Sequence, residues 1–199
     1  MTDPVADAAT AALAGALVVL PTETVYGIGT RPDDPRATAR LFDAKARPRE
    51  LELPILVASL AAAEEVAVFD DRARVIATRF WAGPVTLVLP RSDRSRWWEL
   101  GGDGATVGVR MPHHPLALAV LARTGPLAVT SANRSGKPTP ATCDELQALF
   151  GEAVEVYLCE EAPLQGPPST VVDLSGDTAT VLRPGAVPED EILEALARA

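Results

Sequence analysis

Short apolar runs alternate with amphipathic segments from one end of this chain to the other. The apolar runs are rich in Val, Leu and Ile and have the lengths of buried strands. They cover residues 16–20, 53–57, 85–89, 106–111, 127–130, 154–158, 170–174 and 180–182. Between them, residues 21–29 are predicted to form a polar turn. Residues 91–104, with two tryptophans and three glycines, are predicted to form an exposed loop or a loose hairpin, and the Pro- and Gly-rich residues 162–169 a loop.

Helix start signals occur between the predicted strands. Asp34 followed by Pro35 is typical of an N-cap and the first helical position. Ser59 is suited to cap an Ala-rich helix, and Thr142 with Glu145 has the spacing of a capping box. Further helices are predicted over residues 72–80, 116–123 and 189–197. Because strands alternate with helices and the late strands are closely spaced, we expect an α/β fold with a mixed parallel and antiparallel sheet.

Length and composition fit one domain. The chain has 199 residues, 47% of them hydrophobic and only 5% aromatic. A domain of this size can bury about 70% of its unfolded surface, and its core must be built mainly from Ala, Val and Leu. We therefore expect a single domain over residues 1–199.

The charge balance is acidic, with 18 Lys and Arg against 27 Asp and Glu and a formal net charge of −9. Tight non-specific binding to nucleic acid usually needs about six to ten phosphate contacts from basic groups. An acidic chain disfavours a general nucleic-acid coat, although a local basic patch would still allow a weak RNA contact.

Targeting signals and paired cysteines are not evident from the sequence. The first residues lack a basic region before an apolar run, and no apolar stretch reaches the roughly 20 residues of a membrane span. Cys143 and Cys159 have neither C-x-x-C spacing nor a neighbouring His, so we interpret them as free thiols in a reducing cytosol. The expected location is cytoplasmic.

Polar segments stand where predicted strands end, and the first is P-T-E-T-V-Y-G at residues 21–27. In extended backbone Thr22, Thr24 and Tyr26 would share one face, where two hydroxyls and a phenol could hold a small polar ligand. A plain polar turn would give the same pattern.

Lys45 and Arg47 form a candidate cationic pair before Pro48. Proline biases the residue before it toward extended backbone, so both cations are predicted to project to one side, a combination that suits a triphosphate. A solvated helix end is the alternative. Lys45 and Lys137 are the only lysines in the chain, and both fall in polar segments of this kind.

The segment T-S-A-N-R-S-G-K at residues 130–137 follows an apolar strand, at the strand end where open α/β sheets bind ligands. Ser131, Asn133 and glycine-rich backbone could cradle a phosphate. The segment is neither a P-loop nor a Rossmann fingerprint, and a serine-rich turn is the alternative.

Two further polar positions lie at strand ends. Ser169 precedes a strand, and Arg183 closes the last one. His113 and His114 precede a proline without a third ligand nearby, which favours a loop leading into a helix over a metal site.

In their order and spacing these segments resemble the YrdC-like family of L-threonylcarbamoyladenylate synthases, in its short single-domain form. Residues 18–29 (VVLPTETVYGIG) resemble the opening motif of the family, and K-x-R and S-x-N resemble its tetrad. Residues 81–86 (WAGPVT) resemble a W-P-G-P-[LV]-T segment, with Ala82 in place of the first proline. Residues 109–112 (VRMP), 169–173 (STVVD) and 183–185 (RPG) continue the match, which spans about residues 17–185.

The resemblance implies a twisted sheet with a central ligand cleft and a nucleotidyltransferase that joins L-threonine, bicarbonate or CO₂ and ATP. It implies a catalytic tetrad of Lys45, Arg47, Ser131 and Asn133. It implies ATP contacts from Arg47, Thr86, Ser131, Thr139 and Arg183, and threonine contacts from Thr24 and Ser169. It also implies Mg²⁺ held mainly by the ATP phosphates and a downstream transferase complex that modifies adenosine in tRNA.

Leu51, Glu52 and Leu56 depart from the family pattern, which usually has Asn or His, Pro and His at those places. A paralogous carbamoyl-transfer enzyme with a different acceptor is therefore one alternative function. An RNA-binding or ribosome-maturation module is the other, and it would need a basic concave face.

Overall fold

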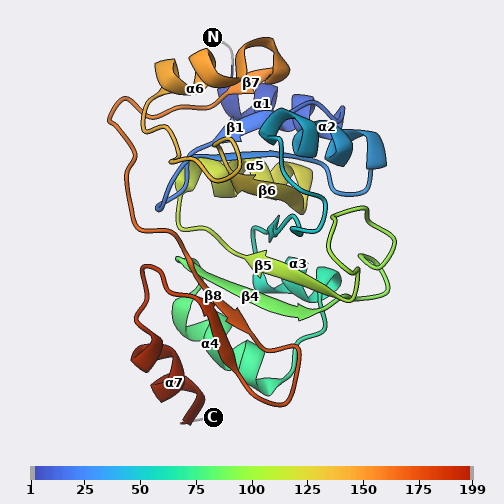
Figure 1. Cartoon of the computed structure of the whole chain (residues 1–199), viewed down its shortest axis with the longest axis vertical. Helices are drawn as coiled ribbons and strands as arrows, with labels where there is room; N and C mark the ends of the chain where they lie inside the picture. The colour runs from blue at the N-terminus through green and yellow to red at the C-terminus, as the bar shows by residue number, and fades with distance from the viewer. Residues whose placement is uncertain (1–2, 198–199) are drawn as a thin grey trace.

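A nine-stranded mixed sheet runs through residues 3–197, the part of the chain that the computed structural model describes (Figure 1). The strand order is β7-β1-β2-β6-β3-β5-β4-β8-β9. The strands are β1 (Val18–Leu20), β2 (Gly27–Thr30), β3 (Ile55–Leu56), β4 (Val85–Pro90), β5 (Thr106–Arg110), β6 (Leu127–Ser131), β7 (Val156–Tyr157), β8 (Thr170–Asp173) and β9 (Thr180–Arg183). The pairs β1–β7, β3–β5 and β4–β8 are parallel and the others antiparallel, which confirms the predicted mixed sheet.

Helices cover the sheet, and three of them begin at the predicted caps. They are α1 (Pro4–Leu13), α2 (Pro35–Lys45), α3 (Leu60–Val66), α4 (Asp71–Phe80), α5 (Pro115–Thr124), α6 (Cys143–Phe150), the 3₁₀ turn η1 (Gly151–Ala153) and α7 (Glu189–Ala197). Asp34 caps α2 through the Arg36 amide, Ser59 caps α3, and Thr142 with Glu145 forms a complete capping box on α6. The two ends of the described chain lie at opposite ends of the molecule (Figure 1).

The core lies on both faces of the sheet because strand side chains alternate. Val18 and Leu20 of β1 belong to one apolar cluster with α1 and α5, whereas Val19 belongs to a larger cluster that α2, α3, α4, α6 and α7 help to close. Strands β1, β2, β3 and β6 are buried on both sides, which explains why the apolar runs there are continuous rather than alternating.

The predicted polar turn over residues 21–29 is partly wrong, because its last three residues begin β2, which pairs with β1 and β6. Glycines are depleted in strands, but here they allow the backbone of β2 to approach β6 closely. A Cβ on Gly29 would lie 2.5 Å from the Ala128 carbonyl oxygen, and one on Gly27 would lie 2.6 Å from Val129 Cγ1.

The Ala-rich segment at the beginning of the chain forms α1, a helix that the hydrophobic pattern did not predict. Asp3 caps it by accepting hydrogen bonds from the amides of Val5 and Ala6. Ala8 and Ala12 are fully buried and belong to the cluster shared with α5. Small side chains allow close packing here but give only a weak amphipathic signal in sequence.

The segment 91–104 is a loop, as predicted, but only part of it is exposed. Trp97 is 80% exposed, whereas Arg91, Ser95 and Leu100 are buried. Ser95 Oγ donates to the Val66 carbonyl oxygen, and Leu100 belongs to the larger core cluster. The loop is therefore anchored from inside rather than loosely held.

Candidate active site

A cleft of about 680 Å³ crosses the middle of the sheet and brings the polar strand ends together. Its walls come from strands β2, β3, β4, β5, β6, β8 and β9 and from the loops between them. Of the predicted site residues, it is lined by Thr22, Thr24, Tyr26, Arg47, Thr86, Ser131, Thr139, Ser169 and Arg183. Lys45 and Asn133 are not among its lining residues.

The Thr22 hydroxyl shapes the first polar segment. It donates to the Val25 carbonyl oxygen at 2.6 Å and lies 2.9 Å from the Thr24 hydroxyl. The backbone amides of Thr24 and Val25 point toward the same hydroxyl. Tyr26 lines the cleft, and its phenol oxygen accepts from the Glu160 amide at 2.9 Å. The shared-face prediction for Thr22, Thr24 and Tyr26 is consistent with all three lining the cleft.

Arg110, at the end of β5, is a cleft residue to which the sequence analysis gave no role. Its guanidinium donates to Thr24 Oγ1 at 3.2 Å and to the Gly83 carbonyl oxygen at 3.2 Å, and it forms an ion pair with Glu23 at 2.8 Å. The sequence did contain one signal for Arg110, because it is an arginine at the end of an apolar run. A buried arginine needs several polar partners, so its position indicates a polar site. Arg110 places a fixed positive charge beside Thr24.

Thr86, Ser169 and Arg183 meet at the far end of the cleft. Because β4 and β8 are parallel neighbours, Thr86 on β4 faces Ser169 just before β8, and their hydroxyl oxygens lie 2.9 Å apart. Arg183 donates to the Ser169 carbonyl oxygen at 2.7 Å and to its hydroxyl at 3.0 Å. Burial, together with the nearby Arg110 charge, lowers the pKa of Arg183, but the ordinary value is so high that the guanidinium stays charged.

Arg47 enters the cleft from the loop after α2. Its Nε donates to the Leu51 carbonyl oxygen at 3.1 Å and its Nη2 to the Glu52 carbonyl oxygen at 2.7 Å. Two main-chain acceptors therefore fix the guanidinium plane. Burial lowers the pKa of Arg47, yet the group remains a cation at neutral pH. With Arg110 and Arg183 it makes the cleft a receptor for an anion.

Lys45 does not project beside Arg47, so the predicted extended conformation of this pair is wrong. Lys45 is the last residue of α2, and Ala46 has left-handed backbone with φ 50° and ψ 44°. Lys45 lies on the buried face of α2 with Leu41 and Phe42, and only 1% of it is exposed, while the turn at Ala46 redirects the chain before Arg47. Its ammonium donates to the Ser131 carbonyl oxygen, to the Asn133 carbonyl oxygen at 2.7 Å and to Asn133 Oδ1 at 3.0 Å.

The loop after β6 is thus held in two ways: Lys45 donates hydrogen bonds to it from the protein interior, and Asn133 makes hydrogen bonds within the loop. Ser131 Oγ donates to Asn133 Oδ1 at 2.6 Å, and Asn133 Nδ2 donates to the Lys137 carbonyl oxygen. Ser131 and Thr139 then face the cleft. The tetrad is brought together in space, but Lys45 and Asn133 hold the loop, whereas Arg47 and Ser131 line the cavity.

The Lys45 ammonium should make activity fall as pH rises through neutrality. Burial, together with the neighbouring Arg47 charge, lowers the pKa of Lys45 to about 7. Three acceptor oxygens need three N–H donors, so only the charged form satisfies them all. With ATP, the substrate that the family resemblance implies, we expect kcat/KM to decline above about pH 7 in a profile from about pH 6 to 9; a flat profile would contradict this role.

The lowered pKa of Lys45 affects the free energy of unfolding in the opposite direction: activity should fall as pH rises, whereas stability should rise. Between about pH 7 and the ordinary value of 10.5, the unfolded chain holds the Lys45 proton that the folded chain has released. The unfolded state then binds more protons, so the contribution of Lys45 to the free energy of unfolding rises with pH across that window. Denaturant titrations at several pH values would measure it.

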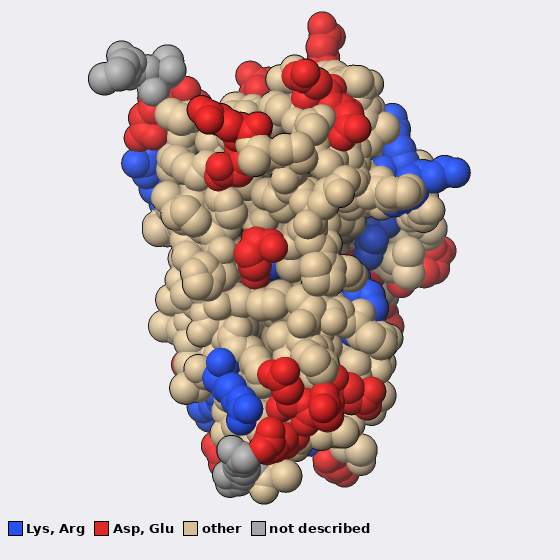
Figure 2. Space-filling view, turned by 90° about the vertical axis from the view of Figure 1, so that its left-hand side faces the viewer, with Lys and Arg blue, Asp and Glu red and all other residues tan. Residues whose placement is uncertain are grey.

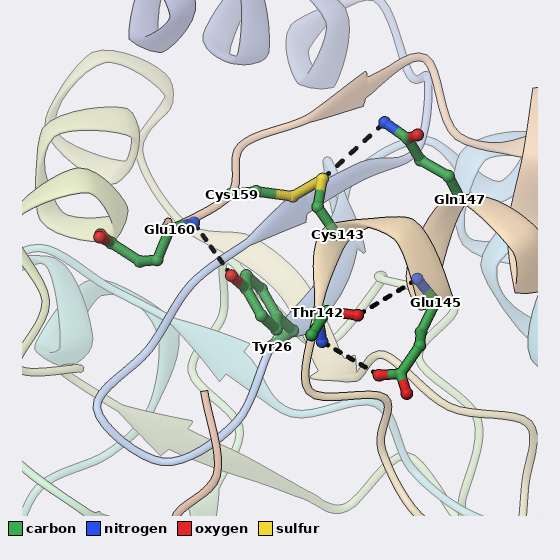
Figure 3. Close-up of a disulfide and its surroundings, with 7 residues drawn as sticks. All are labelled: Tyr26, Thr142, Cys143, Glu145, Gln147, Cys159 and Glu160. Carbon is green, nitrogen blue, oxygen red and sulfur yellow. Dashed lines mark hydrogen bonds between the residues drawn. A yellow bond between two sulfur atoms is a disulfide. The ribbon is translucent and has the colours of Figure 1, made fainter. Parts of the chain in front are cut away.

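Cys143 and Cys159 form a disulfide, so the prediction of two free thiols is wrong (Figure 3). Cys143 is the first residue of α6, where the capping box fixes it, and Cys159 follows β7. The β1–β7 pairing carries Cys159 to within a Cα–Cα distance of 5.8 Å of Cys143. Sequence spacing of 16 residues gave no hint of this contact. The disulfide lies next to Glu160, whose amide binds Tyr26 (Figure 3).

The outer surface contrasts with the cationic cleft. On the face shown in Figure 2, acidic side chains gather toward both ends of the molecule. Glu189, Asp190 and Glu191 stand in the first turn of α7. This face is not the basic surface that the RNA-binding alternative requires.

The part of the chain that the structure describes contains neither a metal-ligand cluster nor a membrane-spanning helix. Between residues 3 and 197, no cluster of three or more His, Cys, Asp or Glu side chains could hold a metal ion. His114 precedes α5 and its Nε2 lies 3.2 Å from Glu160 Oε1, while burial lowers the pKa of His114. Within the same range, none of the helices combines the length and apolarity needed to cross a membrane.

Known proteins share both the sequence pattern and the fold. The profile of the Sua5/YciO/YrdC family, described as telomere recombination, matches residues 10–185. A Mycobacterium tuberculosis protein is 43% identical over 184 residues, which cover 92% of this chain and 84% of that protein. A threonylcarbamoyl-AMP synthase of Chromohalobacter salexigens is 38% identical over 181 residues, covering 88% of this chain and 96% of that enzyme.

Among solved structures, the crystal structure of P. abyssi Sua5 complexed with L-threonine has a TM-score of 0.87 to this chain. The two are 36% identical, and the match covers 98% of this chain and 58% of the P. abyssi chain. The mixed sheet and its flanking helices are therefore shared with a protein whose structure holds an amino acid.

Proposed function

The chain belongs to the Sua5/YciO/YrdC family, and from that premise we propose that it is a threonylcarbamoyl-AMP synthase. The observation that carries the proposal is the cleft in which Arg47, Arg110 and Arg183 converge with hydroxyls from three strand ends. Three cations suit a triphosphate together with the carboxylate of an amino acid.

The proposed reaction has two steps. The amine of L-threonine attacks the carbon of CO₂, derived from bicarbonate, and loses a proton to give a carbamate. A carbamate oxygen then attacks the α-phosphorus of ATP, the bond to the bridging oxygen breaks, and pyrophosphate leaves. In-line attack at phosphorus depends on positioning and charge neutralisation more than on an acid–base pair, and the cleft supplies those two things.

The cleft divides into two parts in this proposal. ATP is surrounded by Arg47, Ser131, Thr86, Thr139 and Arg183. Lys45 and Asn133 fix the loop that presents Ser131. Thr24 and Ser169 hold L-threonine, and Arg110 beside Thr24 provides a cation for its carboxylate.

Mg²⁺ fits this cleft only as a companion of ATP. Within residues 3–197, one carboxylate lines the cavity, that of Glu52, and it is already paired with Arg91 at 2.6 Å. We therefore propose that the phosphates of ATP bring Mg²⁺, with the Ser and Thr hydroxyls nearby, and that the ion neutralises charge on the phosphates. A cytoplasmic location, and a downstream transferase complex that passes the group to tRNA adenosine, complete the proposal.

A paralogue with another acceptor is the second candidate, because all three departures from the family pattern, Leu51, Glu52 and Leu56, line the cleft. The apolar side chains of Leu51 and Leu56 would suit an amine with a different substituent. The ATP side of the cleft is the same in both candidates.

Pyrophosphate release from ATP with bicarbonate and Mg²⁺, measured with each amino acid singly, tests both candidates. We expect threonine-dependent release and a product with the mass of threonylcarbamoyl-adenylate, with Arg47→Ala as the inactive control. Release with another amine alone would replace threonine by that acceptor. No release with any amine would overturn the enzyme assignment, and RNA retention that falls with salt would then favour the binding-module alternative.

A further inference from the structure

We propose that the buried ion pair of Arg91 and Glu52 is a positioning device that holds Arg47 in the cleft. Arg91 Nη2 lies 2.6 Å from Glu52 Oε1, and the Arg91 side chain is only 3% exposed. The main chain of Glu52 at the same time accepts the Arg47 Nη2 donor at 2.7 Å. Glu52 therefore makes both contacts: its side chain pairs with Arg91, and its carbonyl oxygen accepts a hydrogen bond from Arg47.

Arg91 is tied firmly on its other side. Its Nε donates to the Thr106 carbonyl oxygen at 2.8 Å, at the beginning of β5, and its Nη1 donates to the Trp98 carbonyl oxygen at 2.8 Å. The guanidinium thus joins the sheet to the loop 91–104. Because its partners are main-chain atoms of a rigid strand and an anchored loop, Arg91 is a fixed point from which Glu52 can be held.

The loop and the segment around Glu52 are also joined main chain to main chain. The Leu53 amide donates to the Leu100 carbonyl oxygen at 2.7 Å, and the Gly102 amide donates to the Arg49 carbonyl oxygen at 2.9 Å. Gly101 has φ 79°, and a Cβ there would lie 2.5 Å from the Arg49 carbonyl oxygen. Contact this close requires glycine. The Arg91–Glu52 ion pair adds a side-chain contact between the same two segments, and Glu52 lines the cleft.

The local structure depends on the opposite charges of Arg91 and Glu52. Arg91 is too buried to stay charged without an anion, and removing one partner of a buried ion pair leaves an uncompensated charge that the structure must relieve by rearrangement. Burial raises the pKa of Glu52, an effect that Arg91 opposes. When Glu52 is neutral, the segment 51–52 loses its anchor, and both carbonyl acceptors of Arg47 can shift with it.

Glu52 has a long side chain, and its ion pair with Arg91 fixes where that side chain lies. The pair thereby limits the freedom of the segment whose carbonyl oxygens accept from Arg47. The inference rests on the proposed function only in taking ATP as the anion that Arg47 meets.

The test is a double-mutant cycle read out by ATP affinity, which requires no turnover and therefore stands apart from the amino-acid assay. Glu52→Gln, Arg47→Ala and the double variant are compared with the parent protein by calorimetric titration with Mg–ATP. A residue that acts through Arg47 should lose its effect once Arg47 is gone. We expect Glu52→Gln to weaken ATP binding by about ten-fold in the parent and by less than about two-fold in the Arg47→Ala background.

The surface pair of Arg74 and Glu64, at 2.9 Å, supplies the matched control, since Glu64→Gln removes a partly exposed carboxylate remote from Arg47 and should leave ATP affinity unchanged. Melting temperatures of all variants verify that they are folded. Unchanged affinity in Glu52→Gln would overturn the proposal. Equal weakening in both backgrounds would overturn it too, because it would show a general loss of structure that does not pass through Arg47.

Discussion

Replacing Lys45 by Ala should abolish turnover, lowering kcat/KM for ATP by about a thousand-fold. The ammonium is the common donor to the Ser131 carbonyl oxygen and to two oxygens of Asn133. Without it, buried acceptors lose their donor, at a cost of about 1–3 kcal/mol for each one left unsatisfied. The loop after β6 would rearrange to reach water, and Ser131 would leave its place in the cleft.

Lys45→Met separates the charge from the volume of the side chain. Methionine fills similar space but cannot donate, so we expect it to be nearly as inactive as Lys45→Ala while losing less free energy of unfolding. Steady-state pyrophosphate release and urea titrations measure the two quantities. Full activity in either variant would remove Lys45 from the mechanism. Activity in Lys45→Met alone would show that packing, not hydrogen bonding, is its contribution.

Lys45 also shows why the sequence could locate the site but not apportion the roles within it. Strand ends and turn chemistry are local signals, and they correctly gathered Thr24, Arg47, Ser131 and Ser169 around one cleft. Lys45 points inward because it is the last residue of α2 and lies on the same buried face as Leu41 and Phe42. The sequence analysis instead took residues 45–47 as extended backbone, because of Pro48, and so predicted that two cations at spacing two would act alike. The helix ends only at Ala46, in a left-handed conformation that alanine rarely adopts.

The same limit applied to the fold: its elements could be predicted from local sequence, but contacts between distant segments could not. Apolar runs and caps located the strands and most helices, because burial on two faces and N-cap hydrogen bonds leave local marks. Gly27 and Gly29 look like turn residues, and only the closeness of β6 turns them into strand positions. The partners of Arg110, such as Glu23, and the contact between Cys143 and Cys159 likewise depend on segments that are distant in sequence.

Cys143→Ser should lower the free energy of unfolding by about 3 kcal/mol. The disulfide closes a loop of 16 residues, and cross-linking a loop of about that length removes roughly this much chain entropy from the unfolded state. For a domain near 200 residues the melting temperature should fall by about 6–12 °C. The effect on turnover should be smaller than that of Lys45→Ala, because the disulfide lies outside the cleft lining.

Reductant provides the matched experiment. Dithiothreitol should lower the melting temperature of the parent protein by the same amount and leave that of Cys143→Ser unchanged, with thiol titration of the denatured protein counting the two cysteines in each state. An equal melting temperature with and without reductant would contradict a stabilising bridge. Reduction is also the condition expected in a cytoplasm that keeps thiols reduced. Because the capping box on α6 and the Tyr26–Glu160 hydrogen bond do not depend on sulfur, the cleft should keep its shape, and the reduced enzyme should remain active at moderate temperature.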